Sequence, residues 1–163
     1  MTTIAFRDGV LAADTLISYS TYTNGNRSKI VRCGDYQVGL AGLAWIKEPF
    51  EKWVSDGCDP ELVPQVVLDN ESAFAVLLMD DSGKAYDYAK GYLVPIDAEY
   101  HAIGSGGFFA MGAMAHGASA IEAVLAGIRH DKASGGGITH VEAPIQYAVM
   151  TAVTGRASHQ LPN

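Results

Sequence analysis

Two groups next to the amino terminus could act together as a nucleophile and its base. If Met1 is removed, Thr2 carries both a hydroxyl and a free α-amine. An α-amine has an ordinary pKa of about 7.7–8.0, against about 10.4 for a lysine, so a terminal amine is a usable base near neutral pH. The covalent structure holds this base close to the hydroxyl that it must activate. A Met-Thr start is common by chance, and while Met1 remains the Thr2 nitrogen is an amide that cannot act as a base.

A second candidate motif is the glycine-rich segment Gly104-Ser105-Gly106-Gly107 ahead of an expected helix. Helix N-termini bind anions, so one alternative is a phosphate-binding loop. The segment supplies only part of a dinucleotide-binding fingerprint and follows no obvious parallel strand unit. It also differs from the Gly-x-Ser-x-Gly elbow, because Ile103 stands where the first glycine would be. The segment therefore favours neither function.

Cysteine and histidine residues are too dispersed to predict a metal centre or a disulfide framework. Cys33 and Cys58 stand apart, with no Cys-x-x-Cys pair, and the five histidines form no His-Glu-x-x-His motif. The run Asp80-Asp81-Ser82-Gly83 is a turn, too short for a calcium loop. We therefore expect no metal ion and no cofactor.

Composition narrows the class of protein. The chain has 163 residues, of which 48% are hydrophobic and 18% charged, which suits one domain over residues 1–163 with a polar, frayed tail at 155–163. A net charge of −7 argues against nucleic-acid and anionic-membrane surfaces, which need clustered cations. The longest apolar run, 73–79, is far below the roughly 20 residues of a membrane span, and the chain start lacks the features of a signal peptide. The sequence predicts a soluble, cytoplasmic protein.

The pattern of apolar and turn-forming residues predicts antiparallel sheets and grouped helices, an α+β class in which helices cover sheets. The segment Asn24-Gly25-Asn26 is a strong hairpin-turn signal, because Asn and Gly tolerate positive φ. An apolar i, i+3, i+4, i+7 stripe that begins at Ile121 predicts a helix over 119–130. Further helices are expected over 43–55 and 108–116, with a piece at 61–68 that Pro64 interrupts. The expected strands are residues 3–6, 10–13, 15–23, 28–33, 36–41, 72–80, 84–89, 100–103, 138–142 and 145–153.

Five blocks of sequence occur in the order found in one family of hydrolases. They are Thr2-Thr3-Ile4-Ala5-Phe6 with Gly9-Val10-Leu11-Ala12-Ala13-Asp14, then Ser28-Lys29-Ile30, Leu40-Ala41-Gly42, Ile103-Gly104-Ser105-Gly106-Gly107 and Asp131-Lys132-Ala133-Ser134-Gly135-Gly136. Each block is unspecific alone, but the ordered set resembles proteasome β-subunits and their bacterial HslV-type relatives. Those proteins are N-terminal nucleophile (Ntn) hydrolases with a threonine at the mature terminus. The resemblance implies a four-layer αββα sandwich, in which helices cover two antiparallel sheets.

The resemblance also implies a catalytic set: Thr2, Asp14, Lys29, Ser105, Asp131 and Ser134, with Gly42 in the oxyanion hole. In that set the Lys29 cation favours negative charge on the Thr2 oxygen, and Asp14 fixes the ammonium group of Lys29 by a charge-assisted contact. The backbone N–H of Gly42 stabilises the tetrahedral oxyanion. Seen singly, these residues are an ordinary strand-end aspartate, a surface lysine and a strand-to-helix turn.

The remaining members of the set belong to the amine side of the reaction. Ser105 reaches the Thr2 amine and shares in proton transfer, while Asp131 and Ser134 hold that amine and orient its lone pair. Without the resemblance, the last two are common polar residues at the end of a helix.

The same matching implies a pocket for the side chain before the scissile bond, lined by Ile17, Arg27, Val31, Leu40 and Ala44. Four of these residues are apolar, so we expect an apolar or small side chain there, with Arg27 at the rim. Leu43 stands where relatives commonly carry a second glycine, which brings a leucine side chain close to the expected oxyanion site.

The function that the resemblance implies is a threonine peptidase that cleaves polypeptides. Family members assemble into rings stacked face to face, so a homo-oligomer is expected, and an ATP-dependent unfoldase would be a fitting partner although the chain carries no signature of one. Removal of Met1 by an aminopeptidase is then required, since no propeptide precedes it. Two alternatives remain open: a catalytically silent ring subunit that retains Met1, and an Ntn amidase or transpeptidase that acts on a small substrate.

Overall fold

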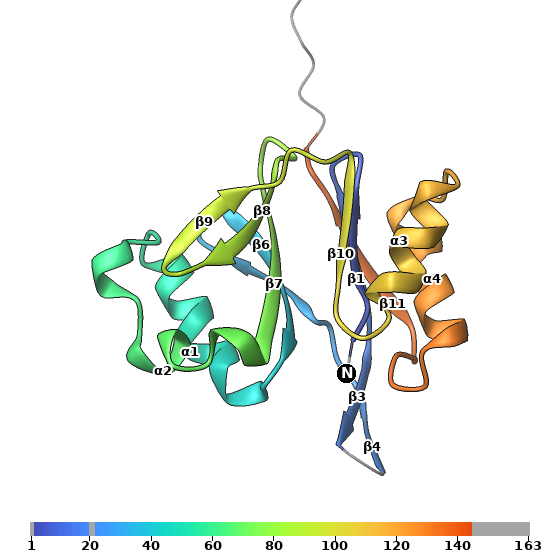
Figure 1. The fold of residues 1–163 in the computed structure, drawn as a ribbon, viewed down its shortest axis with the longest axis horizontal. Coiled ribbons are helices and arrows are strands. Elements are labelled where there is room, and N and C mark those ends of the chain that lie inside the picture. The colour runs from blue at the N-terminus through green and yellow to red at the C-terminus, as the bar shows by residue number, and fades with distance from the viewer. Residues whose placement is uncertain (1, 20–21, 145–163) are drawn as a thin grey trace, which may run out of the picture.

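The computed structural model describes residues 2–19 and 22–144, and Figure 1 shows the path of the chain through them. The strands are β1 (Ile4–Arg7), β2 (Val10–Asp14), β3 (Leu16–Tyr19), β4 (Tyr22–Asn26), β5 (Ile30–Cys33), β6 (Tyr36–Gly42), β7 (Phe74–Asp80), β8 (Ala85–Ala89), β9 (Tyr92–Pro95), β10 (Tyr100–Ile103) and β11 (Ile138–Glu142). The helices are α1 (Ala44–Ser55), α2 (Gln65–Leu68), α3 (Gly107–Ala115) and α4 (Ala120–His130), with single 3₁₀ turns at Pro60–Leu62 and Glu71–Ala73.

One sheet is built around the amino-terminal strand. Its four strands lie in the order β10-β1-β2-β11, and each neighbouring pair is antiparallel. The β1–β2 hairpin turns at Asp8 and Gly9, whose φ angles of 51° and 71° are those of a tight two-residue turn. The predicted first hairpin is therefore confirmed, and β1 has a partner strand on both sides.

The second sheet has five antiparallel strands in the order β5-β6-β7-β8-β9. The strand β9 was not predicted; it follows a turn at Lys90 and Gly91, which both have positive φ. The predicted strand over 145–153 and the tail at 155–163 lie outside the described residues.

The prediction for residues 15–26 is wrong in detail. These residues form a separate two-stranded ribbon, β3–β4, and Asn24-Gly25-Asn26 lies within β4 instead of at the turn. The register shifts between Leu16 and Ser18, so two residues of β4 oppose one residue of β3. Gly25 has a φ of 103°, and a glycine with positive φ is typical of one class of bulge. Gly25 thus has the expected positive φ, but it lies in a bulge and not in a turn.

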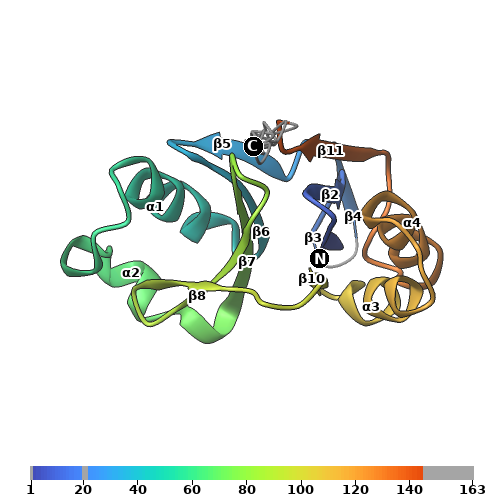
Figure 2. The same cartoon turned by 90° about the horizontal axis from the view of Figure 1, so that it is seen from above.

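The helices form close to where the sequence predicts them. The capping box of α4 is complete, because the Ser119 hydroxyl accepts the Glu122 N–H and the Glu122 carboxylate accepts the Ser119 N–H. The expected piece at 61–68 is divided into a 3₁₀ turn and the short helix α2, with Pro64 directly before α2. The helices α1 and α2 cover one sheet, and α3 and α4 cover the other (Figure 2).

Alternating side chains of the strands divide the core into separate groups. Between the two sheets, Ile4 and Leu11 pack with Leu77 and Met79. On the opposite face of β1 and β2, Ala5 and Ala12 pack against α3 and α4. On the other side, Phe50 and Trp53 of α1 pack with Val76 and Leu78 of β7. The two sheets therefore face each other, and Thr2 lies just before a strand that belongs to this packed interior.

Candidate active site

The pairing of β1 with both neighbouring strands brings the expected catalytic residues to Thr2. Ile4 pairs with Ile103 of β10, and extending this antiparallel register by two residues puts Ser105 opposite Thr2. Ile4 also pairs with Ala13 of β2, and one further step puts Asp14 opposite Thr3. Backbone bonds continue the ladder, from the Asp14 N–H to the Thr3 carbonyl at 3.1 Å and from the Gly106 N–H to the Thr2 carbonyl at 3.3 Å.

A chain of hydrogen bonds leads away from the Thr2 nitrogen. This nitrogen donates to the Ser105 hydroxyl at 3.3 Å, and the Ser105 hydroxyl donates to Asp131 Oδ2 at 2.5 Å. The Ser134 hydroxyl donates to the same carboxylate oxygen at 2.7 Å, and the Ala133 N–H donates to Oδ1. Because Met1 is present, the Thr2 nitrogen is an amide here. Removal of Met1 would place a free amine at the start of this chain of hydrogen bonds.

These contacts set the charge state of Asp131. Partial burial alone would raise the pKa of this carboxyl, but the hydrogen bonds from Ser105, Ser134 and the Ala133 N–H outweigh burial, and the pKa of Asp131 lies below its ordinary value. Asp131 is therefore a carboxylate at neutral pH.

The second cluster on the other side of Thr2 is an ion pair between Lys29 and Asp14. The Lys29 Nζ donates to Asp14 Oδ1 at 2.8 Å, and both side chains are buried, with 6% and 0% of their surface exposed. Asp14 also accepts the Thr3 N–H on Oδ1 and the Gly135 N–H on Oδ2. These bonds hold the carboxylate in the orientation that the Lys29 ammonium group needs.

Burial changes the acidity of Lys29. Desolvation lowers the pKa of the ammonium group below its ordinary value, and the hydrogen bond and charge of Asp14 offset that effect only in part. The Lys29 ammonium group therefore loses its proton at a lower pH than that of a solvent-exposed lysine.

A cavity of about 360 Å³ opens beside Thr2. Besides Thr2, its lining residues come from β3, the segment before β5, the end of β6 and the start of α1: Leu16, Ile17, Ser18, Arg27, Ser28, Lys29, Leu40, Gly42, Leu43, Ala44, Trp45 and Lys47. Four of the five residues expected in the specificity pocket are among them, as are Thr2 and Lys29. The fifth, Val31, packs against the core group that contains Cys33 and Val38.

Gly42 ends β6 at the edge of this cavity, with a φ of 128°. A Cβ atom on this residue would lie 2.5 Å from the Ala73 carbonyl oxygen and 2.6 Å from Phe74 Cα. Both the backbone conformation and the available space therefore require glycine at this position. The residue expected in the oxyanion hole thus shares the cavity with Thr2.

Two features of the site were not found from the sequence. Thr3 is fully buried, and its hydroxyl lies 2.7 Å from the Ser134 hydroxyl. Because the Ser134 hydroxyl donates to Asp131, Thr3 is the donor in this contact. Gly127, inside α4, leaves room for the Thr3 side chain, since a Cβ at Gly127 would overlap with Thr3 Oγ1. A glycine inside an otherwise regular helical stripe was the available signal for this contact.

Lys47 is the other feature that was missed. It follows Ala44 by three residues on α1, which puts both on the same side of the helix, and both line the cavity. Helical spacing from the expected pocket residue Ala44 was therefore sufficient to find it.

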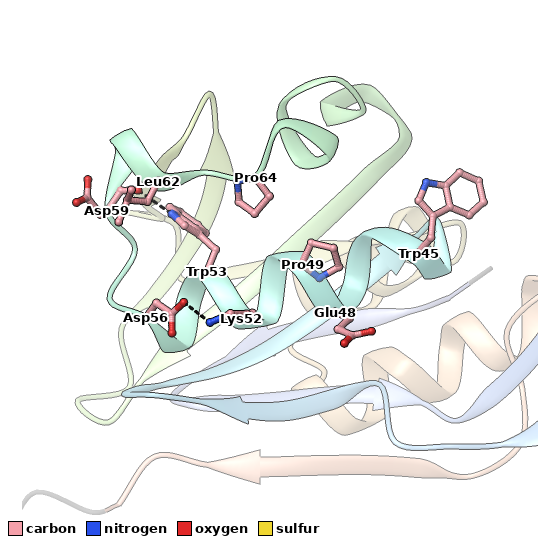
Figure 3. Close-up of a pocket in the computed structure, with 9 residues that line it drawn as sticks. All are labelled: Trp45, Glu48, Pro49, Lys52, Trp53, Asp56, Asp59, Leu62 and Pro64. Atoms are coloured by element: carbon pink, nitrogen blue, oxygen red, sulfur yellow. Dashed lines mark hydrogen bonds and ion pairs between the residues drawn. The ribbon is translucent and has the colours of Figure 1, made fainter.

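A larger cavity, of about 490 Å³, lies away from this cluster, on the outer side of α1 (Figure 3). Trp53, Pro49 and Pro64 line it, and the Trp53 indole donates to the Asp59 carbonyl oxygen at 2.8 Å. Trp45 lines both cavities, but no residue of the expected catalytic set lines this larger one. Size alone therefore does not locate the candidate site.

Residues 2–19 and 22–144 contain no group of three or more His, Cys, Asp or Glu side chains that could hold a metal ion. None of the helices described is both long and apolar enough to cross a membrane.

Comparison with known proteins gives a fold but no sequence family. No family model matches the sequence, and neither does any curated protein. Two solved structures of Thiobacillus denitrificans BPH, a bacterial proteasome homologue, resemble this one. The complex of that protein with epoxomicin has a TM-score of 0.64 at 22% identity, over 88% of this chain and 99% of that one. The second structure has a TM-score of 0.65 at 21% identity, over 89% and 99% of the two chains. The chain therefore has a proteasome-like fold of antiparallel sheets and helices.

Proposed function

We propose that this protein is a threonine peptidase in which Thr2 is the nucleophile once Met1 has been removed. The observation that carries the proposal is the position of Thr2 between two polar clusters: the Ser105–Asp131 bonds at its nitrogen, and the Lys29–Asp14 pair, whose lysine lines the same cavity as Thr2. The likeness to a proteasome homologue that binds epoxomicin supports it. The fold is then the four-layer αββα sandwich of the Ntn hydrolases, formed by a single domain.

In the first half of the reaction the Thr2 hydroxyl attacks a peptide carbonyl. The amine of Thr2 takes the hydroxyl proton, and the Gly42 N–H stabilises the negative charge that forms on the carbonyl oxygen. The C–N bond then breaks, and the protonated amine gives its proton to the departing peptide amine. The product is an ester between the acyl part of the substrate and Thr2.

Water completes the cycle. The Thr2 amine, again neutral, removes a proton from water, which attacks the ester and releases the acyl fragment as a carboxylic acid. The proton on the amine returns to the Thr2 oxygen, so the enzyme ends as it began.

The neighbouring groups each have one task in this cycle. An amine N–H that donates to Ser105 leaves the nitrogen lone pair available for the Thr2 hydroxyl, and the Asp131 carboxylate fixes the orientation of Ser105. The positive charge of Lys29 lowers the free energy of the developing Thr2 oxyanion, because it acts in a cavity partly shielded from water. Asp14 positions Lys29.

The broader features of this proposal follow the HslV type. Copies of the chain would form stacked homo-oligomeric rings in the cytoplasm, with the sites on the inside, and would receive polypeptides from an ATP-dependent unfoldase. No cofactor, nucleic acid or membrane takes part.

The test is a mass measurement after reaction with an epoxyketone such as epoxomicin, a warhead that needs a hydroxyl and a free amine on one residue. We expect the wild-type chain to lack Met1 and to gain one inhibitor mass at Thr2. The Thr2→Ser variant keeps both groups and should react, whereas Thr2→Ala should not.

Three results would refute the proposal in different ways. Full retention of Met1 on all chains would favour the silent ring subunit. Labelling of Thr2 with hydrolysis of small amides but not of peptides would favour the amidase. Equal peptide turnover by wild type and Thr2→Ala would exclude Thr2 as the nucleophile.

A further inference from the structure

The cavity beside Thr2 has a charge opposite to that of the whole protein. The chain carries 11 basic against 18 acidic residues, a net charge of −7. The cavity nevertheless is lined by three cationic side chains, Arg27, Lys29 and Lys47, and by no aspartate or glutamate among the described residues. Acidic residues outnumber basic ones in the whole chain, so the cations in this lining are concentrated where a substrate would bind.

The carboxylates that pair with two of these cations do not line the cavity. Asp14 is completely buried behind Lys29, and Glu51 contacts Lys47 at 3.6 Å from the next turn of α1. The positive charges therefore face the cavity while their partners lie outside its lining. This arrangement favours an anionic group inside the cavity.

Arg27 differs from the other two cations because no described carboxylate pairs with its guanidinium group. It is an exposed residue whose backbone N–H donates to the Thr15 carbonyl oxygen at 2.8 Å. Within residues 2–19 and 22–144 its guanidinium group has neither a salt-bridge nor a hydrogen-bond partner. Guanidinium groups bind carboxylates through two parallel hydrogen bonds, so a ligand carboxylate is a fitting partner.

The rest of the lining is apolar and would contact the stem of such a ligand. Leu16, Ile17, Leu40 and Leu43 supply aliphatic surface in the same cavity. We propose that the cavity selects an acidic side chain, glutamate, at the substrate residue before the scissile bond. This inference rests on the proposed peptidase function and replaces the apolar preference expected from the sequence, because that expectation counted neither Lys47 nor the orientation of the carboxylates away from the cavity.

Turnover of matched peptides measures this preference. Four fluorogenic peptide amides would be identical except for Glu, Gln, Leu or Lys before the leaving group. For the wild type we expect kcat/KM for Glu to exceed that for Gln about fivefold, the range of one partly exposed ion pair. Lys should be the poorest of the four. The Glu-to-Gln ratio should shrink in 1 M salt, where charges are screened within about 3 Å.

Arg27→Gln and Arg32→Gln form a matched pair of variants. Arg32 lies on the neighbouring strand β5, pairs with Asp81 at 2.6 Å and does not line the cavity. Arg27→Gln should bring the Glu-to-Gln ratio close to one, and Arg32→Gln should leave it unchanged. A ratio that Arg27→Gln does not alter, or a wild type that prefers Leu or Gln to Glu, would overturn the inference.

A binding measurement separates this inference from the proposed function. The Thr2→Ala variant cannot use Thr2, but Trp45 lines the cavity with 62% of its surface exposed and can report on an occupant through its fluorescence. Peptide amides that end in Glu should bind Thr2→Ala more tightly than their Gln counterparts, and the difference should vanish when Arg27→Gln is added. If Thr2→Ala shows this binding difference while the wild type cleaves none of the four peptides, the acidic preference is supported and the peptidase function is refuted. Equal binding of both peptides would refute the preference, whatever the turnover.

Discussion

Replacing Gly127 by alanine tests whether α4 is packed directly onto the segment that carries the nucleophile. In most helices Gly→Ala stabilises the protein by about 1 kcal/mol. At Gly127 the new methyl would overlap with Thr3 Oγ1 and would lie 2.6 Å from Thr3 Cγ2 and 2.9 Å from Thr3 Cβ. Thr3 is fully buried and is bonded to Asp14 and Ser134, so it has little freedom to move away.

The expected size follows from two opposing effects. Severe overpacking costs about 3 kcal/mol, and the gain in helix propensity of about 1 kcal/mol leaves a net destabilisation of about 2 kcal/mol. For a chain of this length that corresponds to a fall in Tm of about 4–8 °C. Because Thr3 also donates to Ser134, which holds Asp131, we expect the rate of epoxyketone labelling at Thr2 to fall as well.

Calorimetry or thermal unfolding followed by circular dichroism would measure the change, with Gly112→Ala as the control. Gly112 lies inside α3, and a Cβ there meets nothing within 4 Å, so this variant should be stabilised. Thr3→Ala should rescue Gly127→Ala, because it removes two of the three overlapping atoms. If Gly127→Ala is as stabilising as Gly112→Ala, the close packing of α4 on Thr3 is refuted.

Two further predictions concern the charges around Thr2. Asp14→Asn leaves Lys29 buried without its charged partner, which should lower the free energy of unfolding by about 3–5 kcal/mol. Asp81→Asn breaks an exposed ion pair and should lower it by at most about 1 kcal/mol. Comparable losses in denaturant titrations of the two variants would contradict this prediction. The pKa of Asp131 is lower in the folded state than in the unfolded one, so its contribution to stability is present above the unfolded pKa of about 3.9 and is lost as pH falls through the folded value. Asp131→Asn should therefore flatten the acid dependence of Tm below about pH 4, and an unchanged acid dependence would be evidence against the hydrogen bonds to this carboxylate.

Much of the site could be predicted because its residues occupy consecutive positions on paired strands. Once β1 is paired with β10 and β2, the positions of Ser105 and Asp14 beside Thr2 and Thr3 follow from counting along antiparallel strands. The sequence blocks around these residues were visible without a structure.

Other features depend on contacts between distant segments and left little trace in the sequence. The positive φ of Gly25 was predicted correctly, yet a local signal does not distinguish a turn from a bulge, because that depends on the register with β3. The strand β9 has mostly exposed residues, so the apolar alternation that reveals a strand is weak. The expected pocket residue Val31 is partly buried and packs against the core group under α1, because the packing of α1 decides which side chains of β5 the core covers.

The burial of Thr2 has a consequence for the order of events during maturation. Thr2 is 6% exposed, and its carbonyl is already bonded to the loop after β10. An aminopeptidase must bind the residues on both sides of the bond that it cuts, and the Thr2 carbonyl is already held by the Gly106 N–H. If the proposed function is correct, Met1 is removed before folding, and a copy that folds with Met1 attached would remain inactive.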